Sequence, residues 1–275
     1  MRLTFQKCAI ALFALYVAVF PGSLITVSLD RVPEWGVWMG SALLIVQGLM
    51  MFAWLVSRYG VRGLIASAVI VLMGFGIEFV GEKTGFPFGS YGYTDVLQPQ
   101  LFGSTPIAIC CAWLFVVAAS YEVAKSLTPN PLSRYPLVIA ATLVLLLDLQ
   151  IETVAVYVNN YWTWFDAGPY YNVPTANFVA WWLVGLSMAG VLALCMRGAT
   201  ISVAPGATIR EQRLWSFIPQ MLYVLNVIMF TAINLSHGYV LAGLIGVAIL
   251  IGAGLLFIRY RPDVPKVLVP HRRLD

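Results

Sequence analysis

The sequence predicts an all-α fold, a polytopic membrane bundle of about eight transmembrane helices in a single integral membrane domain over residues 1–275. Hydrophobic residues make up 60% of the chain and charged residues only 10%, whereas soluble domains carry roughly a quarter charged residues. The mean hydropathy is +0.85. The apolar residues gather in runs of about 20, the length that a helix needs to cross the hydrocarbon core. We therefore expect the protein to lie in the lipid bilayer, and because no basic run is interleaved with aromatic residues, nucleic acid is not an expected partner.

Eight apolar runs are each expected to form one transmembrane helix. The first, 8–28, has basic flanks like those of a signal peptide, but it is longer than the apolar part of one and lacks a clear cleavage site. Within it, Pro21 and Gly22 are expected to kink or end the helix. The other seven runs follow in order as 35–56, 62–82, 105–126, 135–157, 174–197, 214–235 and 239–258.

The distribution of Lys and Arg predicts the orientation of these helices. With the N-terminus on the cytoplasmic side, the segments on that side hold 14 of the 16 basic residues, and the outer segments hold only Arg31 and Lys83. Cytoplasmic loops of membrane proteins carry such an excess of positive charge. We therefore expect both termini in the cytoplasm and the protein in the cytoplasmic membrane.

Four carboxylates lie within two predicted spans that both run outward. Glu78 and Glu82 lie near the outer end of the third span, and Asp148 and Glu152 lie in the outer half of the fifth. Each pair has i, i+4 spacing and so shares one face of its helix. A charge at the bilayer centre costs about 2.5–3.5 kcal/mol, and no intramembrane Lys or Arg neutralises these groups. Either they stay protonated, because burial disfavours the charged form, or they bind cations. For Glu78 and Glu82 the alternative is an interfacial position, with Glu82 paired to Lys83 or solvated.

Aromatic and amide side chains are expected at the same outer level. They are Tyr91 and Tyr93 in the loop after the third span, Trp162, Trp164 and Tyr171 in the loop after the fifth, and Asn177 and Trp181 one turn apart in the sixth span. For some of the rings the alternative is the aromatic belt at a membrane interface.

The seventh span adds further polar groups. It carries Asn226 and Asn234, with His237 just beyond its outer end. Positions 226 and 237 are three helical turns apart and share a face. Hydrogen bonding between helices is the alternative role for the asparagines, and it is the one that we expect for Asn234; for His237 the alternative is an ordinary loop residue.

Several kinds of site are absent from the sequence. It contains no phosphate-binding Gly loop, no nucleophile elbow and no Cys/His zinc pattern, and its two histidines exclude a histidine-rich di-iron site. No cofactor and no metal are therefore expected. Acids among aromatic rings suit proton-initiated chemistry, in which a neutral acid protonates a carbon–carbon double bond and aromatic faces stabilise the cation. A proton- or cation-coupled transporter would also place acids in its spans, whereas a non-catalytic scaffold leaves Asp148 without a purpose.

Four blocks of the sequence resemble one family of membrane proteins. They are "GEKTGFPFGSYGYTD", "PIAICCAWLFV", "LLLDLQIETVAVYV" and "YWTWFDAGPYYNVPTANFVAWW", in this order over roughly residues 78–182. In these blocks the chain resembles the CruF-type carotenoid biosynthesis membrane proteins, the carotenoid 1,2-hydratase and bisanhydrobacterioruberin hydratase family. The resemblance implies a cofactor-independent addition of water across the terminal C1=C2 bond of a linear (ψ-end) carotenoid, giving a tertiary alcohol. The implied partners are a membrane-dissolved C30, C40 or C50 carotenoid and water, with other carotenoid-pathway enzymes as further candidates.

The residues and the resemblance together lead to a hypothesis for the roles of individual residues. Asp148 or Glu78 is the expected proton donor, and the other of the two, with Asn177, is expected to position the water; Glu82 and Glu152 complete the candidate catalytic set. The candidate substrate-binding residues are Tyr91, Tyr93, Trp162, Trp164, Tyr171 and Trp181. The chain departs from the family pattern where an Asp followed by Pro is usual, because it has Glu152 followed by Thr153. We expect Glu78, and not Glu82, to face Asp148.

Overall fold

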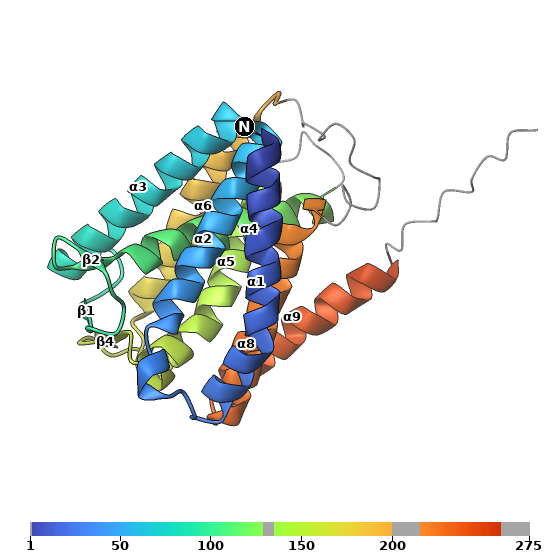
Figure 1. The fold of residues 1–275 in the computed structure, drawn as a ribbon. Coiled ribbons are helices and arrows are strands. Elements are labelled where there is room, and N and C mark those ends of the chain that lie inside the picture. The colour runs from blue at the N-terminus through green and yellow to red at the C-terminus, as the bar shows by residue number, and fades with distance from the viewer. Residues whose placement is uncertain (1, 129–134, 200–214, 260–275) are drawn as a thin grey trace, which may run out of the picture.

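The computed structural model describes residues 2–128, 135–199 and 215–259, with side chains described as far as residue 255. Within these ranges, eight long helices pack into one bundle (Figure 1). They are α1 (Arg2–Ser28), α2 (Met39–Tyr59), α3 (Val61–Thr84), α4 (Ile107–Leu127), α5 (Tyr135–Thr153), α6 (Thr175–Met196), α8 (Ile218–Ser236) and α9 (Val240–Arg259). A short 3-10 helix, η1 (Glu34–Gly36), precedes α2, and a π-helical segment, η2 (Val154–Val158), extends α5.

The predicted all-α membrane fold is confirmed. Of the described helices, seven are long and apolar enough to cross a membrane, and the part of α9 whose side chains are described, Val240–Leu255, is also apolar. All eight predicted runs coincide with helices, although residue 214, where the seventh run begins, lies outside the described residues. The chain is therefore a multi-pass integral membrane protein.

One boundary prediction was wrong in part. Pro21 lies inside α1, which begins at Arg2 and continues past Gly22 to Ser28. The helix therefore does not end at this position, which was one of the two expected outcomes. Transmembrane helices tolerate an internal proline because neighbouring groups can satisfy the backbone carbonyl that it leaves without a partner.

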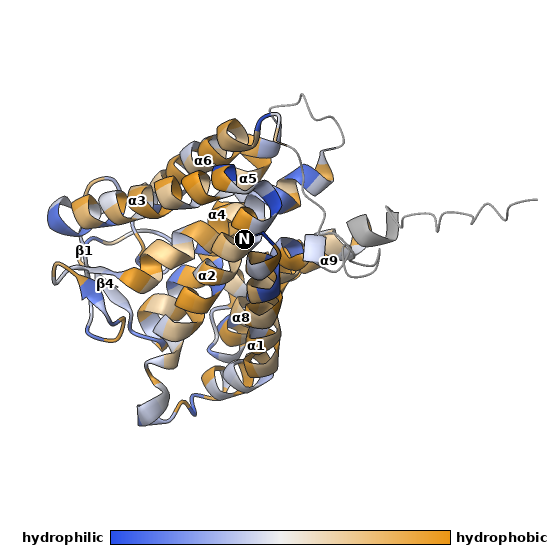
Figure 2. Ribbon diagram, turned by 45° about the horizontal axis from the view of Figure 1, so that its top comes forward, coloured by the Kyte–Doolittle hydropathy of each residue, from blue (hydrophilic) through white to orange (hydrophobic). Residues whose placement is uncertain are grey.

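Helix α4 lies at the centre of the bundle and α1 at its edge. In the most apolar stretch of α4, 78% of the residues are buried, against 11% in that of α1. Helix α4 contacts α2, α3, α5, α6 and α8. Figure 2 shows apolar residues along the lengths of the helices and hydrophilic residues mainly at their ends and in the connecting loops. Outward-facing side chains such as Leu72 and Leu194 are 67% and 74% exposed, as suits helices surrounded by lipid.

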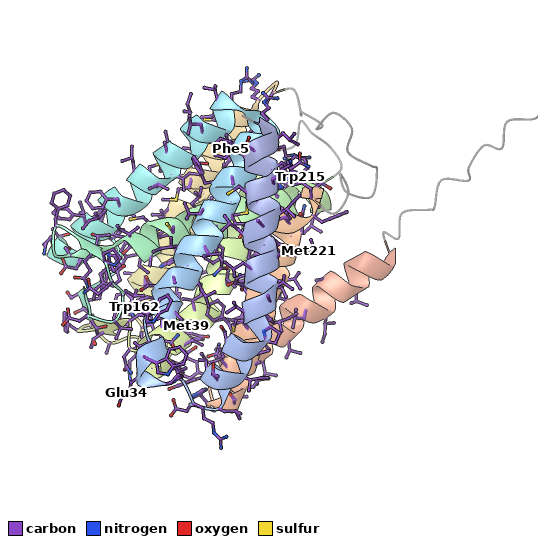
Figure 3. All side chains as sticks on the ribbon, viewed as in Figure 1. Phe5, Glu34, Met39, Trp162, Trp215 and Met221 are labelled. Carbon is purple, nitrogen blue, oxygen red and sulfur yellow. The ribbon has the colours of Figure 1, made fainter. Side chains whose placement is uncertain are left out.

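Two small β-ribbons interrupt the helical pattern, and the sequence analysis did not predict them. In the first, β1 (Tyr91–Tyr93) pairs antiparallel with β4 (Trp162–Trp164), although the two strands are about 70 residues apart in the chain. In the second, β2 (Gln100–Leu101) pairs with β3 (Thr105–Pro106). The β1–β4 ribbon lies at the end of the bundle away from the N-terminus of α1, and we call this the ribbon end (Figure 1). Figure 3 shows Glu34 and Trp162 toward this end, and Phe5 and Trp215 toward the other.

The loops that carry β1 and β4 are joined by further hydrogen bonds. The carboxylate of Asp166 accepts the backbone N–H of Ser90 at 2.7 Å. The N–H of Phe165 bonds to the carbonyl of Ser90 at 2.8 Å, and the N–H of Thr94 bonds to the carbonyl of Tyr161 at 3.0 Å. Bonds on both sides of the short strands therefore fix their pairing.

Two glycines of α3 are expected to respond oppositely to alanine. A Cβ on Gly63 would overlap the backbone carbonyl of Leu55 on α2, whereas a Cβ on Gly76 would meet no atom within 4 Å. Gly63→Ala should therefore destabilise the protein by about 1–3 kcal/mol, since backbone must move to make room. Gly76→Ala should be neutral or stabilising by up to about 1 kcal/mol, since alanine favours the helix. Apparent melting temperatures in detergent micelles check this pair, and equal shifts would show that α2 and α3 do not approach each other as described.

Candidate active site

The first buried acid at the ribbon end, Glu78 of α3, is held by neutral donors. Its Oε2 accepts the hydroxyl groups of Tyr91 at 2.7 Å and Tyr93 at 2.6 Å, and its Oε1 accepts the indole N–H of Trp113 at 2.7 Å. The residue is only 4% exposed. No Lys or Arg of the described ranges forms an ion pair with it. Three hydrogen bonds from uncharged groups therefore replace the water that a surface glutamate would have.

The second buried acid, Glu152 of α5, is held in the same way. Its Oε2 accepts the indole N–H groups of Trp162 at 3.2 Å and Trp164 at 2.9 Å. Its Oε1 accepts the side-chain amide of Asn177, from the first turn of α6, at 2.8 Å. Glu152 is 1% exposed. Each glutamate thus receives three hydrogen bonds, two of them from the β1–β4 ribbon.

Asn177 links Glu152 to the third acid, Asp148. Its amide nitrogen also donates to Asp148 Oδ2 at 3.3 Å. Asp148 lies one turn before Glu152 on α5 and is fully buried. The other oxygen of Asp148, Oδ1, is buried without a hydrogen-bond partner. The two acids of α5 therefore share one amide group, and one carboxyl oxygen of the pair has no donor.

The pairing of β1 with β4 explains how one ribbon serves both glutamates. Tyr91 lies opposite Trp164 and Tyr93 opposite Trp162. Alternate residues of a strand point to the same face, so the four rings share one face of the ribbon while the residues between them, Gly92 and Thr163, point away. The two tyrosines of β1 reach Glu78, and the two tryptophans of β4 reach Glu152.

The two tyrosines of this face are neutral donors. Burial raises the pKa of Tyr91 and of Tyr93 above the ordinary value of a phenol, and the nearby carboxylate of Glu78 raises both further. A raised phenol pKa keeps the O–H proton in place at neutral and moderately alkaline pH. The hydrogen bonds to Glu78 therefore persist across that range.

A small cavity of about 70 Å³ lies between the two glutamates and the aromatic rings. Its polar lining includes Glu78, Glu152 and Asn177. Trp113 of α4 and Trp181 of α6 also line it, and their rings stack with centroids 4.0 Å apart. The remaining wall is largely apolar and comes from α2, α4, η2 and α8, for example from Leu44, Ile109, Val116, Val154 and Phe230. The arrangement brings acids, an amide and aromatic faces together around one small space.

Most of the residues singled out from the sequence lie at this cavity. Its lining contains Glu78, Glu152, Asn177, Tyr91, Tyr93, Trp162, Trp164 and Trp181. Asp148 is not part of the lining and lies behind Asn177, to which it is hydrogen-bonded. Glu78, and not Glu82, was expected to face Asp148; of the two acids of α5, it is Glu152 that lines the cavity with Glu78.

Two of the predicted site residues lie elsewhere. Glu82 pairs with Lys83 at 2.9 Å and accepts the hydroxyl of Ser104 at 2.7 Å, which is the interfacial alternative considered above. Tyr171 packs edge-on against Tyr239, and its hydroxyl accepts the backbone N–H of Leu241 at the start of α9. Neither residue lines the cavity, because the loop and helix faces that carry them turn toward other elements.

The polar residues of α8 have structural roles in the bundle. Asn234 donates to the backbone carbonyl of Gln150 on α5 at 3.0 Å, as expected for a bond between helices. Asn226 donates to the side chain of Gln47 on α2 at 2.7 Å. His237 ends α8 as its C-cap. None of the three lines the cavity of the acids.

Trp113 is the main residue of the cavity that the sequence analysis missed. It donates to Glu78 and stacks on Trp181, yet in the sequence it is one tryptophan in the apolar run "PIAICCAWLFV". The ribbon had a clearer signal, because "YGY" and "WTW" alternate large rings with small residues, a period-2 pattern that favours strands. The aromatic content of these loops concealed that pattern.

Comparison with known proteins identifies related sequences. A family described as "Carotenoid biosynthesis protein" matches residues 39–253. The bisanhydrobacterioruberin hydratase of Haloarcula japonica is 30% identical over 126 residues, which are 45% of this chain and 42% of that protein. The match therefore covers less than half the length of this relative. No solved structure matches the chain.

Removing one hydroxyl from the ribbon tests whether Glu78 is held as a carboxylate. A hydrogen bond to a charged group contributes about 1.5–3 kcal/mol, against about 0.5–1.5 kcal/mol for one between neutral groups. Tyr91→Phe should therefore destabilise the protein more than Tyr223→Phe, which removes a buried hydroxyl from the backbone carbonyl of Leu143. Thermal unfolding in detergent micelles compares the two variants. Equal losses would indicate that Glu78 is neutral.

Proposed function

The chain belongs to the carotenoid biosynthesis protein family, and we propose that it adds water to the terminal C1=C2 double bond of a linear carotenoid, giving a tertiary alcohol. Such an enzyme is a carbon–oxygen lyase of the hydro-lyase type. One observation carries the proposal: Glu78, Glu152 and Asn177 line a single small cavity whose other walls are aromatic and apolar. The name of the Haloarcula relative, a hydratase, supports the same reaction.

The acids of α5 are the proposed source of the proton. Asp148 and Glu152 are buried together, share the amide of Asn177 and have no ion-pair partner among the described residues. Two carboxyl groups in such a site do not both ionise, so the pair retains one proton. The oxygens of Glu152 already accept three N–H groups, whereas Asp148 Oδ1 has none. We infer that the two acids share this proton, that it rests mainly on Asp148, and that Glu152 donates it to C2 when Glu152 is the protonated member, because Glu152 lines the cavity.

Glu78 is the proposed base for the attacking water. Three donors favour its charged form, and a carboxylate can orient a water molecule and accept its proton. Protonation at C2 leaves a cation at C1, the more substituted carbon; the water oxygen bonds to C1, and the released proton passes to Glu78. The acid pair loses one proton and Glu78 gains one, so the return of that proton completes the cycle.

The aromatic walls would stabilise the cation between these two steps. A cation within about 6 Å of a ring face is attracted by the π electrons. The stacked pair of Trp113 and Trp181, with Tyr93 and Trp162 of the ribbon, surrounds the space beside Glu78 and Glu152. Exclusion of bulk water strengthens these interactions, since the local dielectric constant is lower than that of water.

The substrate would reach this site from the bilayer. The positive charges predict that the ribbon end faces outward and that the membrane is the cytoplasmic one, with both termini inside. A C30, C40 or C50 carotenoid dissolved in the membrane, with water from the outer surface, would then meet at the cavity. We treat residues 1–275 as one integral membrane domain, which other carotenoid-pathway enzymes could approach within the membrane.

Expression in a host that makes lycopene tests the reaction directly. Mass spectrometry of the extracted pigments should find products heavier by one water at one or both ends. Unchanged pigments from hosts that make linear carotenoids of several chain lengths would contradict the proposal.

Amide variants of the three acids are expected to lose the reaction. General acid–base groups contribute about 10²–10⁴-fold to rates, so Asp148→Asn, Glu152→Gln and Glu78→Gln should each lower hydration by at least about a hundredfold. Glu82→Gln should keep most of it, because Glu82 pairs with Lys83 away from the cavity. Pigment analysis at matched protein levels measures all four variants. Equal activity of Glu78→Gln and Glu82→Gln would rule out the proposed base.

A further inference from the structure

A second and much larger cavity adjoins the site. Its volume is about 760 Å³, against about 70 Å³ for the cavity of the acids. Pockets that hold ligands in proteins measure about 300–1,000 Å³, so the small cavity can receive only the end of a long molecule. The larger one, which we call the α1 groove, is lined by α1, the loop after it, α2, η2 and α8. Figure 3 shows Met39, which lines the α1 groove, toward the same end of the bundle as Trp162, which lines the small cavity.

We propose that the α1 groove holds the polyene chain of the linear carotenoid while the end group enters the small cavity. This proposal rests on the proposed function, because it assigns the remainder of the same substrate to a place in the fold. Along α1 the lining runs from Tyr16 to Val27, which corresponds to about 17 Å at a rise of about 1.5 Å per residue. The groove therefore has the elongated form that a rod-like chain requires.

The two cavities share part of their walls. Five residues line both of them: Leu44 of α2, Val154 of η2, Asn159 and Tyr161 after it, and Phe230 of α8. A chain that passes between the cavities must therefore cross this set. The hydroxyl of Tyr161 lies close to Gly40, where an added Cβ would overlap it.

Small residues of α1 keep the groove open. Ala18, Gly22 and Thr26 follow one another at i, i+4 spacing along its wall, so they share one face of the helix. A Cβ placed on Gly22 would meet no atom within 4 Å. The space beside α1 is therefore not filled by side chains of the neighbouring helices.

The lining matches an uncharged, apolar occupant. Val19, Leu43, Met229 and Ile233 lie along the walls, and the charged group of the lining is Asp30, at the end of the groove. Amide groups also line the groove, namely those of Gln47, Asn159, Asn160 and Asn226. Asn226 donates to Gln47 and to the backbone of its own helix. Among the residues that the structure describes, no Lys or Arg lines the groove to bind a phosphate. These features favour a hydrocarbon polyene over a phospholipid, which would bring an anionic headgroup.

A graded series at Gly22 tests the proposal. Because the position is open, Gly22→Ala, Gly22→Leu and Gly22→Phe should fill the groove progressively without a clash. The matched control is Gly190→Phe on α6, where a Cβ also meets no atom within 4 Å and which lines neither cavity. Two quantities are measured: the carotenoid retained per protein after purification in detergent, and the hydrated product formed in the lycopene-producing host.

Retention of carotenoid tests the groove, whereas formation of hydrated product tests the proposed function. We expect retention to fall in the order Ala, Leu, Phe, by at least about tenfold for Gly22→Phe relative to Gly190→Phe, with hydration falling in parallel. Retention is also measured for Gly22 variants that carry Glu78→Gln as a second substitution, so that binding is measured without turnover. If the wild-type protein forms no hydrated pigment, a loss of retention in Gly22→Phe would support the groove and reject the reaction.

Three results would overturn the groove as the chain site. The first is equal retention by Gly22→Phe and Gly190→Phe while the wild-type protein hydrates its substrate, in which case the proposed function stands. The second is a wild-type protein that retains no carotenoid. The third is that Gly22→Phe co-purifies with less phospholipid while its bound carotenoid is unchanged. That result would assign the groove to a lipid acyl chain.

Discussion

Glu78 and Glu152 each receive three hydrogen bonds from neutral donors, and the arrangement of the ribbon end follows from the need to supply them. A buried charge without partners costs several kcal/mol, and hydrogen bonds to charged groups return about 1.5–3 kcal/mol each. The donors come from β1, β4, α4 and α6, so helices α3 to α6 and both long loops must be in place together. A buried Lys or Arg would satisfy the acids more simply, but it would also hold them permanently as ions. Neutral donors leave the charge of the cluster free to change by one proton.

Much of this arrangement could be predicted from local patterns. Eight apolar runs and the positions of 16 basic residues determine the number of helices and their expected orientation, because the bilayer imposes length and charge rules that act on each segment separately. The i, i+4 spacing of Glu78 with Glu82, and of Asp148 with Glu152, identified the polar faces of two helices. Spacing could not show which acid of the first pair turns inward, since that depends on how α3 is rotated against α4. The contacts of Glu82 with Lys83 and Ser104 settle it.

The features that escaped prediction depend on contacts between distant parts of the chain. Trp113 matters because its position on α4 brings its N–H to Glu78 and its ring to Trp181, and neither neighbour is close in sequence. The β1–β4 ribbon forms from two loops, each of which alone resembles an aromatic belt. Tyr171 was grouped with the site because it is an aromatic residue of the same loop, yet it packs toward α9. Residue type and sequence proximity were sufficient to find the region but not to choose among its rings.

The pairing of β1 with β4 has a consequence for how the chain can vary in length. Surface loops usually accept inserted or deleted residues, but a shift of one residue in a strand turns every side chain to the opposite face. One residue added inside "YGY" or "WTW" would turn one of the two rings of that strand away from the acids. Because each strand has only three residues, few other backbone hydrogen bonds could stabilise the altered register. Indels are therefore expected to be excluded from these two strands, while the exposed turn around Phe102 and Gly103, which meets no such requirement, could lengthen freely.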